Sequence, residues 1–385
     1  MLGFPNGFEY LSSGNIIMFL CGGFLLYLGI GKKMEPLLLV PIGFGVILAN
    51  LPLGGLDVNP TMDADKVFNC GELMQRVFTF GMGWEIIPCF IFLGLGALTE
   101  FSPMIANPKS LLLGAGAQFG VYFTFFIVLF FGWLGIFPFN MKEACSIGII
   151  GGADGPTTIY LTNIFAPHIL GATAVAAYSY MAMVPIIQPP IIKLLTTKKE
   201  RVIYMRPTLR PVSVKERLLF PIVATIIIIL LVPKCAPLIG MLMFGNLLRV
   251  SGVTDRLANT ASESFIDILT ILLGLSVGCT MSAENFLKLE SIFIFILGLI
   301  AFSVSTAFGI ILAKIMNLFL KEKINPMIGA AGVSAVPMSA RVVQIIGQKE
   351  NPKNYLLMHA MGPNIAGVIG TAVAAGIFLG CLLYT

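Results

Sequence analysis

Two short segments combine polar side chains with glycine and proline inside otherwise apolar sequence. The first reads Gly-Gly-Ala-Asp-Gly-Pro-Thr-Thr over 151–158 and carries Asp154. A carboxylate in such a setting is costly unless a cation or a hydrogen-bond donor compensates it, so Asp154 is a functional candidate. Glycine and proline also free backbone carbonyls, and carboxylate, hydroxyl and carbonyl oxygens suit a hard cation such as Na⁺. The competing interpretation is that Asp154 caps the helix that follows it.

The second segment runs from Asn325 to Arg341. Asn325 and Ser334 offer oxygen ligands, and Gly329 allows a close approach of the backbone. The guanidinium of Arg341 can bind a carboxylate or a carbamate-like anion through two hydrogen bonds. As an alternative, Arg341 is a basic anchor at a membrane surface.

Five further polar residues are secondary candidates. Tyrosines in a membrane helix usually pack or face lipid, but Tyr178 and Tyr180 flank a serine and precede Gln-Pro-Pro at 188–190. His359 could carry protons or hydrogen-bond between helices. Asn364 follows it, and Ser339 is more typical of helix packing than Ser334.

The composition places these segments in a membrane protein. Of 385 residues, 57% are hydrophobic and 11% are charged, against about 25% charged in an average soluble domain. Eight basic and two acidic residues lie between Lys193 and Arg217, so this linker is expected on the cytoplasmic side of a bacterial inner membrane. It lies between apolar spans and has no interleaved aromatic residues, which argues against nucleic-acid binding.

Apolar stretches predict an all-α polytopic fold with about ten transmembrane helices. The expected spans are 16–31, 36–53, 84–101, 110–134, 168–192, 217–235, 236–250, 264–282, 290–318 and 352–384. The segments 142–166 and 324–350 are expected to form re-entrant hairpins, entering from the outer and the cytoplasmic side respectively.

Similar motifs recur at a spacing of about 180 residues. Leu-Gly-Leu-Gly at 93–96 resembles Leu-Gly-Leu-Ser at 273–276, and the segment at 147–151 resembles that at 328–332. We therefore predict a first repeat over 1–192, the basic linker over 193–216 and a second repeat over 217–385. Five spans per repeat is an odd number, so the repeats would be inverted. Inverted repeats with broken helices are typical of transporters, including elevator-type ones with a core and a scaffold.

The combination of motifs resembles the membrane-embedded β subunit of bacterial Na⁺-pumping, biotin-dependent decarboxylases. The members serve oxaloacetate, methylmalonyl-CoA, glutaconyl-CoA and malonate decarboxylases. The similarity is carried by residues 151–156, 176–180 with 188–190, and 325–341, and it extends through 94–100 and 361–364.

This resemblance implies a function and roles for the candidates. Carboxybiotin would arrive on a partner subunit and lose CO₂ here, coupled to Na⁺ export and proton consumption. Asp154, Asn325, Gly329 and Ser334 would form the Na⁺ site, Tyr180 would donate the proton and Arg341 would face carboxybiotin. The partners implied are a carboxyltransferase α subunit, a biotin carrier and a small γ/δ membrane subunit in an oligomeric complex.

The main alternative is a stand-alone Na⁺-coupled transporter of a carboxylate. Such a protein would need neither biotin nor a soluble partner. No Met-Lys-Met attachment site for biotin occurs in the sequence, so any biotin must come from another chain.

Overall fold

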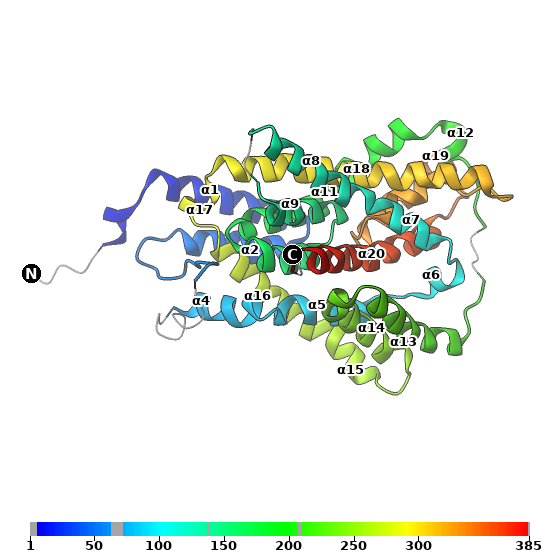
Figure 1. The fold of residues 1–385 in the computed structure, drawn as a ribbon, viewed down its shortest axis with the longest axis horizontal. Coiled ribbons are helices and arrows are strands. Elements are labelled where there is room, and N and C mark those ends of the chain that lie inside the picture. Colours follow the sequence, from blue (N-terminus) through cyan, green and yellow to red (C-terminus); the bar gives the residue numbers. More distant parts are fainter. Residues whose placement is uncertain (1–5, 63–71, 137–138, 207–209, 384–385) are drawn as a thin grey trace, which may run out of the picture.

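The computed structural model describes residues 6–62, 72–136, 139–206 and 210–383, and every regular element in these ranges is a helix. Most of the long helices run along the longest axis of the molecule (Figure 1). The α-helices are α1 (Ser13–Leu26), α2 (Pro36–Ala49), α4 (Leu73–Phe78), α5 (Ile86–Leu98), α6 (Ser102–Ala106), α7 (Ser110–Ala117), α8 (Phe119–Trp133), α9 (Met141–Gly148), α10 (Gly155–Phe165), α11 (Leu170–Leu195), α12 (Lys198–Arg201), α13 (Val214–Leu231), α14 (Ala236–Val250), α15 (Asp255–Thr260), α16 (Ile266–Cys279), α17 (Ala283–Phe286), α18 (Leu289–Phe319), α19 (Met338–Glu350) and α20 (Leu357–Leu383).

In these ranges, six helices are long and apolar enough to cross a membrane, which confirms a multi-pass membrane protein. They correspond to six of the ten expected spans: Ser13–Gly31, Ser110–Trp133, Pro167–Leu195, Asp255–Cys279, Leu289–Phe319 and Leu357–Leu382. The other four expected spans differ in form. The third is a pair of helices, Leu73–Gly83 and Ile86–Leu98, bent by 60°. The second, sixth and seventh are α2, α13 and α14, which are shorter or carry charges in their first turn.

The first Gly/Pro segment folds back on itself. Asn140 caps α9 by accepting from the Glu143 N–H at 2.9 Å, and the chain then tightens into a 3₁₀ turn over Ile149–Gly152. Ala153 has a φ of 55°, in the left-handed region that reverses the chain direction. After α10, His168 Nε2 lies 2.8 Å from Glu143 Oε1. The two ends of the segment therefore lie side by side, and its tip lies between them in sequence.

The second Gly/Pro segment also begins and ends at one place. It consists of a 3₁₀ helix over Pro326–Gly332 followed by α19. At its start, the Asn325 carboxamide donates to the Arg201 carbonyl at 2.8 Å. At its end, Glu350 accepts from Arg201 Nε at 2.8 Å. Both ends of this segment are thus held by one residue of the linker.

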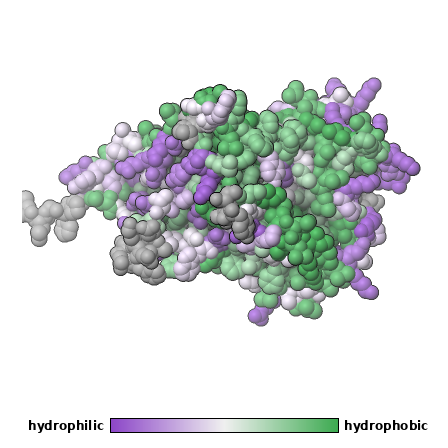
Figure 2. Space-filling model, viewed as in Figure 1, coloured by the Kyte–Doolittle hydropathy of each residue, from purple (hydrophilic) through white to green (hydrophobic). Residues whose placement is uncertain are grey.

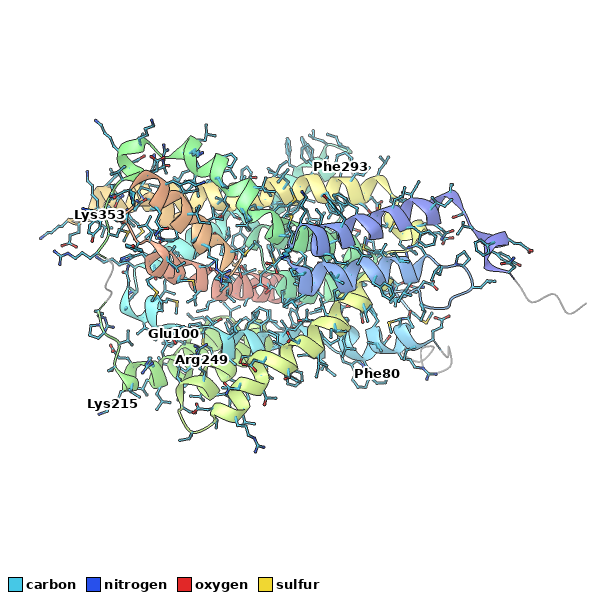
Figure 3. All side chains as sticks on the ribbon, turned by 180° about the vertical axis from the view of Figure 1, so that it is seen from behind. Phe80, Glu100, Lys215, Arg249, Phe293 and Lys353 are labelled. Atoms are coloured by element: carbon cyan, nitrogen blue, oxygen red, sulfur yellow. The ribbon has the colours of Figure 1, made fainter. Side chains whose placement is uncertain are left out.

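The described parts of the linker, 193–206 and 210–216, lie at one end of the molecule (Figure 1 and Figure 3). Figure 3 shows Lys215 and Lys353 at this end and Phe80 toward the other, and Figure 2 shows hydrophilic side chains gathered there. Lys314 Nζ on α18 lies 3.1 Å from Glu200 Oε1. Partial burial raises the pKa of Glu200, but hydrogen bonds from Thr197 and Lys314 outweigh it and leave the pKa below its usual value.

Two pairs of helices cross through glycine. α5 packs on α14, and α16 packs on α2. In each pair, both helices place a glycine at the crossing, and an added Cβ there would overlap a carbonyl group of the other helix or approach it closely. The contacts are Gly96 with the Leu242 carbonyl and Gly245 with that of Leu93 in the first pair, and Gly278 with that of Ile42 and Gly45 with that of Leu275 in the second. In both pairs, a helix of the first half thus crosses a helix of the second half through a glycine on each side.

Candidate functional site

Asp154 lies at the tip of the first hairpin, defined as residues 140–168. Its side chain is 3% exposed. Oδ1 accepts from the Thr157 N–H at 3.1 Å, so Asp154 is the cap of α10, and Oδ2 accepts from Ser334 Oγ at 2.9 Å. The capping interpretation and the functional one therefore coexist, because the two oxygens have different partners.

Ser334 lies at the tip of the second hairpin, residues 325–350. Besides the bond from its hydroxyl to Asp154, its N–H donates to the Gly152 carbonyl at 2.8 Å. The two hairpins are held at their ends by different elements, His168 and Arg201, and touch at their tips. The structure thus brings Asp154 and Ser334 together in the buried interior.

Asn364 on α20 orients the second tip. Its side chain is fully buried, and Nδ2 donates to the Ala331 carbonyl at 3.1 Å and to the Val333 carbonyl at 2.7 Å. Its Oδ1 is buried and accepts no hydrogen bond from the residues that the structure describes. This oxygen is therefore available to a ligand close to Ser334.

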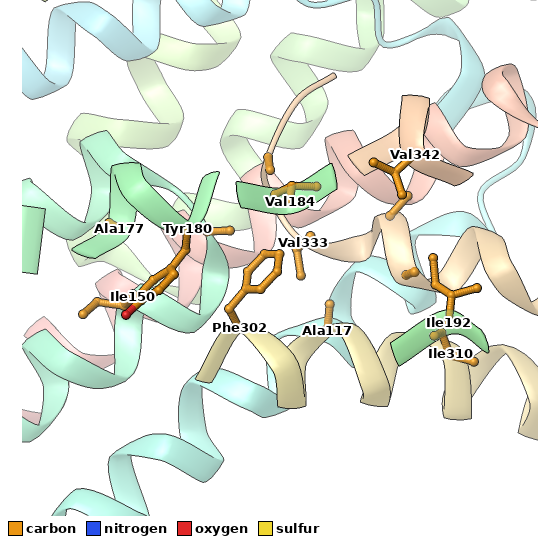
Figure 4. Close-up of a cluster of buried hydrophobic side chains, with 14 of the residues drawn as sticks. Ala117, Ile150, Ala177, Tyr180, Val184, Ile192, Phe302, Ile310, Val333 and Val342 are labelled. Carbon is orange, nitrogen blue, oxygen red and sulfur yellow. The ribbon is translucent and has the colours of Figure 1, made fainter. Parts of the chain in front are cut away.

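The two tyrosines face different groups. The ring of Tyr178 packs on Gly155, where an added Cβ would overlap it, and its buried hydroxyl has no hydrogen-bond partner among the described residues. Tyr180 donates its hydroxyl to the Phe295 carbonyl on α18, and its ring lies beside Ile150 and Phe302 (Figure 4). Tyr178 is thus the tyrosine next to Asp154, whereas Tyr180 joins α11 to α18 and the first tip.

Asn325 and Gly329 lie in the first part of the second hairpin, between the contact with the linker and the tip. The Asn325 amide donates to the Arg201 and Ile203 carbonyls, and its Oδ1 accepts from the Met327 N–H at 3.1 Å. Gly329 packs against the Gly309 carbonyl of α18. Eight residues separate Asn325 from Ser334, and seven of them form a 3₁₀ helix that rises about 2 Å per residue. The structure does not bring the Asn325 side chain to Asp154.

The remaining candidates lie farther from Asp154. Arg341 is exposed on α19. Ser339 Oγ bonds to Gln188 and to the Ala330 carbonyl, so it fixes the second hairpin on α11. His359 Nε2 lies 2.7 Å from the Arg206 carbonyl at the linker end.

Two polar residues near the first tip were not predicted from the sequence. Thr371 Oγ1 lies 3.2 Å from Gln118 Oε1, and an added Cβ at Gly152 would lie 2.6 Å from Thr371 Oγ1. Both side chains are buried. Gln118 and Thr371 are polar side chains inside apolar spans, and this pattern is the sequence signal by which they could have been found.

The donor atoms at the tips are oxygens. Among the residues that the structure describes, no three His, Cys, Asp or Glu side chains cluster as metal ligands. A carboxylate with hydroxyl and amide oxygens around it suits a hard cation, and a single carboxylate balances a single positive charge.

Comparisons with known proteins agree with this arrangement. Residues 14–382 match the family model of the Na⁺-transporting oxaloacetate decarboxylase β subunit. The chain is 53% identical to the methylmalonyl-CoA decarboxylase β subunit of Propionigenium modestum, over 97% of this chain and 96% of that protein. It is 54% identical to the glutaconyl-CoA decarboxylase β subunit of Acidaminococcus fermentans, over 97% and 95%. The oxaloacetate decarboxylase β chain of Klebsiella pneumoniae is 48% identical, over 97% and 96%.

The match covers nearly the whole chain and includes both hairpins. The predicted resemblance is confirmed: this protein belongs to the family of β subunits of Na⁺-transporting decarboxylases, and it is the membrane subunit of a sodium-pumping decarboxylase.

Proposed function

We propose that this chain releases CO₂ from carboxybiotin delivered by a partner subunit and couples that step to Na⁺ export and proton consumption. The observation that carries the proposal is the Asp154–Ser334 hydrogen bond between two hairpin tips. A Na⁺ ion bound between the two residues would take one oxygen from Asp154 and one from Ser334 and would replace the hydrogen bond between them. Cation binding and tip contact are therefore linked.

The Na⁺ site in this proposal is centred on Asp154 and Ser334. The Oδ1 of Asn364 has no hydrogen-bond partner among the described residues and would be a third oxygen, since the same carboxamide donates to the Val333 carbonyl directly before Ser334. Asn325 and Gly329, which the family resemblance adds to the cation site, would contribute through the backbone of the second hairpin. The Asn325 carboxamide already makes three hydrogen bonds, so its own role would be to hold the hairpin on the linker.

Loss of CO₂ from N-carboxybiotin leaves negative charge on the ureido ring, which must take up a proton. The family resemblance assigns the proton donor to Tyr180. The free hydroxyl of Tyr178 next to Asp154 makes Tyr178 the second candidate, and the geometry favours it. Arg341 would bind the carboxylate before CO₂ leaves, which its exposed position allows.

The hairpins support alternating access. We propose two inverted repeats, 1–192 and 217–385, with about ten spans in total, the matched glycine crossings belonging to an elevator-type scaffold and the hairpins to its core. One hairpin is held beside the basic linker and the other at His168, so each would open toward one compartment. The linker, 193–216, would lie in the cytoplasm and the chain in a bacterial inner membrane.

Substrate choice would belong to another subunit. Relatives that share about half of this sequence carry the names of three different decarboxylases. We therefore propose a complex with a carboxyltransferase α subunit, a biotin carrier and a small γ/δ membrane subunit.

The test is Na⁺ uptake into inverted vesicles that contain the purified complex, with and without avidin. Avidin should abolish uptake because it captures the biotin of the carrier. Avidin-insensitive uptake that follows an added carboxylate would contradict the proposal and favour a stand-alone Na⁺-coupled transporter.

A further inference from the structure

A cavity of about 610 Å³ opens at the linker end, away from the Asp154 site. We call it the vestibule. Its walls come from α7, the end of α18, the start of the second hairpin and the linker segment 204–206. Its basic and aromatic lining residues include Lys109, Tyr204, Arg206, Arg210 and Lys323. Its volume lies within the range of about 300–1,000 Å³ typical of small-molecule sites.

The vestibule has an excess of positive charge. Lys109, Arg206 and Lys323 have no carboxylate within ion-pair distance in the part of the chain that the structure describes. Arg210 forms an ion pair with Glu216 at 2.9 Å. Hydrogen bonds from Arg210 and Ser213 lower the pKa of the Glu216 carboxyl to about 2. Glu322 is the one acidic residue of the lining. Three unpaired cations around one concave surface concentrate a field that attracts anions.

Basic residues are expected at a cytoplasmic end from topology alone. A second basic cavity at this end shows whether topology explains the features of the vestibule. About 380 Å³ lies between α11 and α19, with Lys193, Lys198 and Lys349 in its lining. That cavity has no aromatic residue and includes Glu350, which pairs with Arg201. The vestibule has unpaired arginine and the half-exposed ring of Tyr204, which can stack on a planar group.

The vestibule also reaches the second hairpin. Ile328 of that hairpin lines it, as do Ile324, directly before the hairpin, and Leu113. An added Cβ at Gly332 would lie 2.6 Å from the Leu113 carbonyl, and Gly332 is two residues from Ser334. A ligand in the vestibule would therefore contact the element whose tip bonds to Asp154.

We propose that the vestibule is the first docking site for a carboxylated ureido ring, with Lys109, Arg206 and Lys323 around the carboxylate and Tyr204 against the ring. This inference rests on the proposed function, which supplies carboxybiotin on a mobile arm. It adds a site outside the hairpin tips, where the group is bound before it reaches Arg341 and the Asp154 site.

The probe is a biotin amide with a carboxymethyl group on N1′, in which a methylene keeps the carboxylate from leaving. Its binding to the full chain in phosphatidylcholine nanodiscs is measured by equilibrium dialysis, with unmodified biotin amide as the comparison ligand. The carboxymethyl probe should bind at least about tenfold more tightly, because only it offers charge-assisted hydrogen bonds. Arg206→Gln or Lys323→Gln should weaken its binding about tenfold and leave biotin amide unaffected.

The matched controls are Lys193→Gln and Lys349→Gln, which remove the same charge from the other cavity and should leave binding unchanged. Equal weakening in all four variants would overturn the inference, because bulk charge would then explain binding. Displacement of the probe by phosphatidylglycerol in the nanodisc would also overturn it and assign the vestibule to a lipid headgroup. If the probe does not bind while avidin-sensitive Na⁺ uptake persists, the docking site is wrong and the proposed function stands.

Discussion

Ser334 Oγ donates to Asp154 Oδ2 at 2.9 Å, and this bond joins the tips of two hairpins that are 180 residues apart. The ends of one hairpin meet at Glu143 and His168, and those of the other meet at Arg201. Among the residues that the structure describes, it is the one side-chain hydrogen bond between the two tips. The Ser334 N–H also donates to the Gly152 carbonyl, so the tips separate only when both bonds are broken.

Asp154→Asn should abolish both Na⁺ uptake and Na⁺-dependent decarboxylation. The amide keeps the shape of the carboxylate but removes the negative charge that balances a cation. Both activities are measured on the same purified complex. Asp267→Asn, which makes the same change at an exposed position of α16, should leave both unchanged. Normal pumping by the Asp154 variant would sink the assignment.

Ser334→Ala should weaken the apparent Na⁺ affinity by about tenfold, the worth of one hydrogen bond or oxygen ligand to a charged group. The Na⁺ dependence of decarboxylation provides the measurement. Ser276→Ala is the matched control, because the Ser276 hydroxyl is equally buried and has no described partner. An unchanged Na⁺ dependence in the Ser334 variant would exclude a role of that hydroxyl in cation binding.

Tyr178→Phe and Tyr180→Phe should separate proton donation from packing. If Tyr178 donates the proton, its variant loses decarboxylation by about a hundredfold or more, as for a general acid, and keeps its melting temperature. Tyr180→Phe should instead lower the melting temperature, because it removes the bond to the Phe295 carbonyl. Activity loss confined to Tyr180→Phe would reverse these roles and support the family-based assignment.

Asn325→Ala should destabilise the protein by about 2–3 kcal/mol, because it leaves the buried Arg201 carbonyl without its side-chain donor and removes one of the two amides that donate to the Ile203 carbonyl. Thermal unfolding in detergent measures this effect. Asn351→Ala, at an exposed turn after α19, serves as a control with a smaller expected loss. A stable Asn325 variant that has lost only Na⁺ affinity would instead place its amide among the cation ligands.

Gly96→Ala and Gly278→Ala should each destabilise the protein by about 1–3 kcal/mol, since the added methyl would overlap a carbonyl of the crossing helix. The two losses should be similar, because the crossings use matching positions. Gly240→Ala on α14 adds the same methyl where no atom lies within 4 Å and should stabilise slightly or have no effect. A large loss at Gly240 would remove crossing geometry as the explanation.

The sequence was most informative where physical constraints are strict. Asp154 inside an apolar run and the glycines around it identified the first tip, and the second Gly/Pro segment supplied Ser334 as an oxygen ligand. The spacing could not decide between Tyr178 and Tyr180, because the orientation of a side chain on α11 depends on helix packing. It also could not reveal that Asn325 is bound by linker carbonyls, because those partners lie more than 120 residues away in sequence.

The two bonds that Arg201 makes to the ends of the second hairpin have a thermodynamic consequence for assembly. If a soluble subunit binds the linker, its binding would be coupled to the opening of that hairpin, because Arg201 belongs to the linker and bonds to both hairpin ends. By reciprocity, if Na⁺ changes the hairpin, then Na⁺ must change the affinity of the bound subunit by the same factor as that subunit changes the affinity for Na⁺. The cohesion of the complex would then vary with the Na⁺ gradient that the complex itself creates.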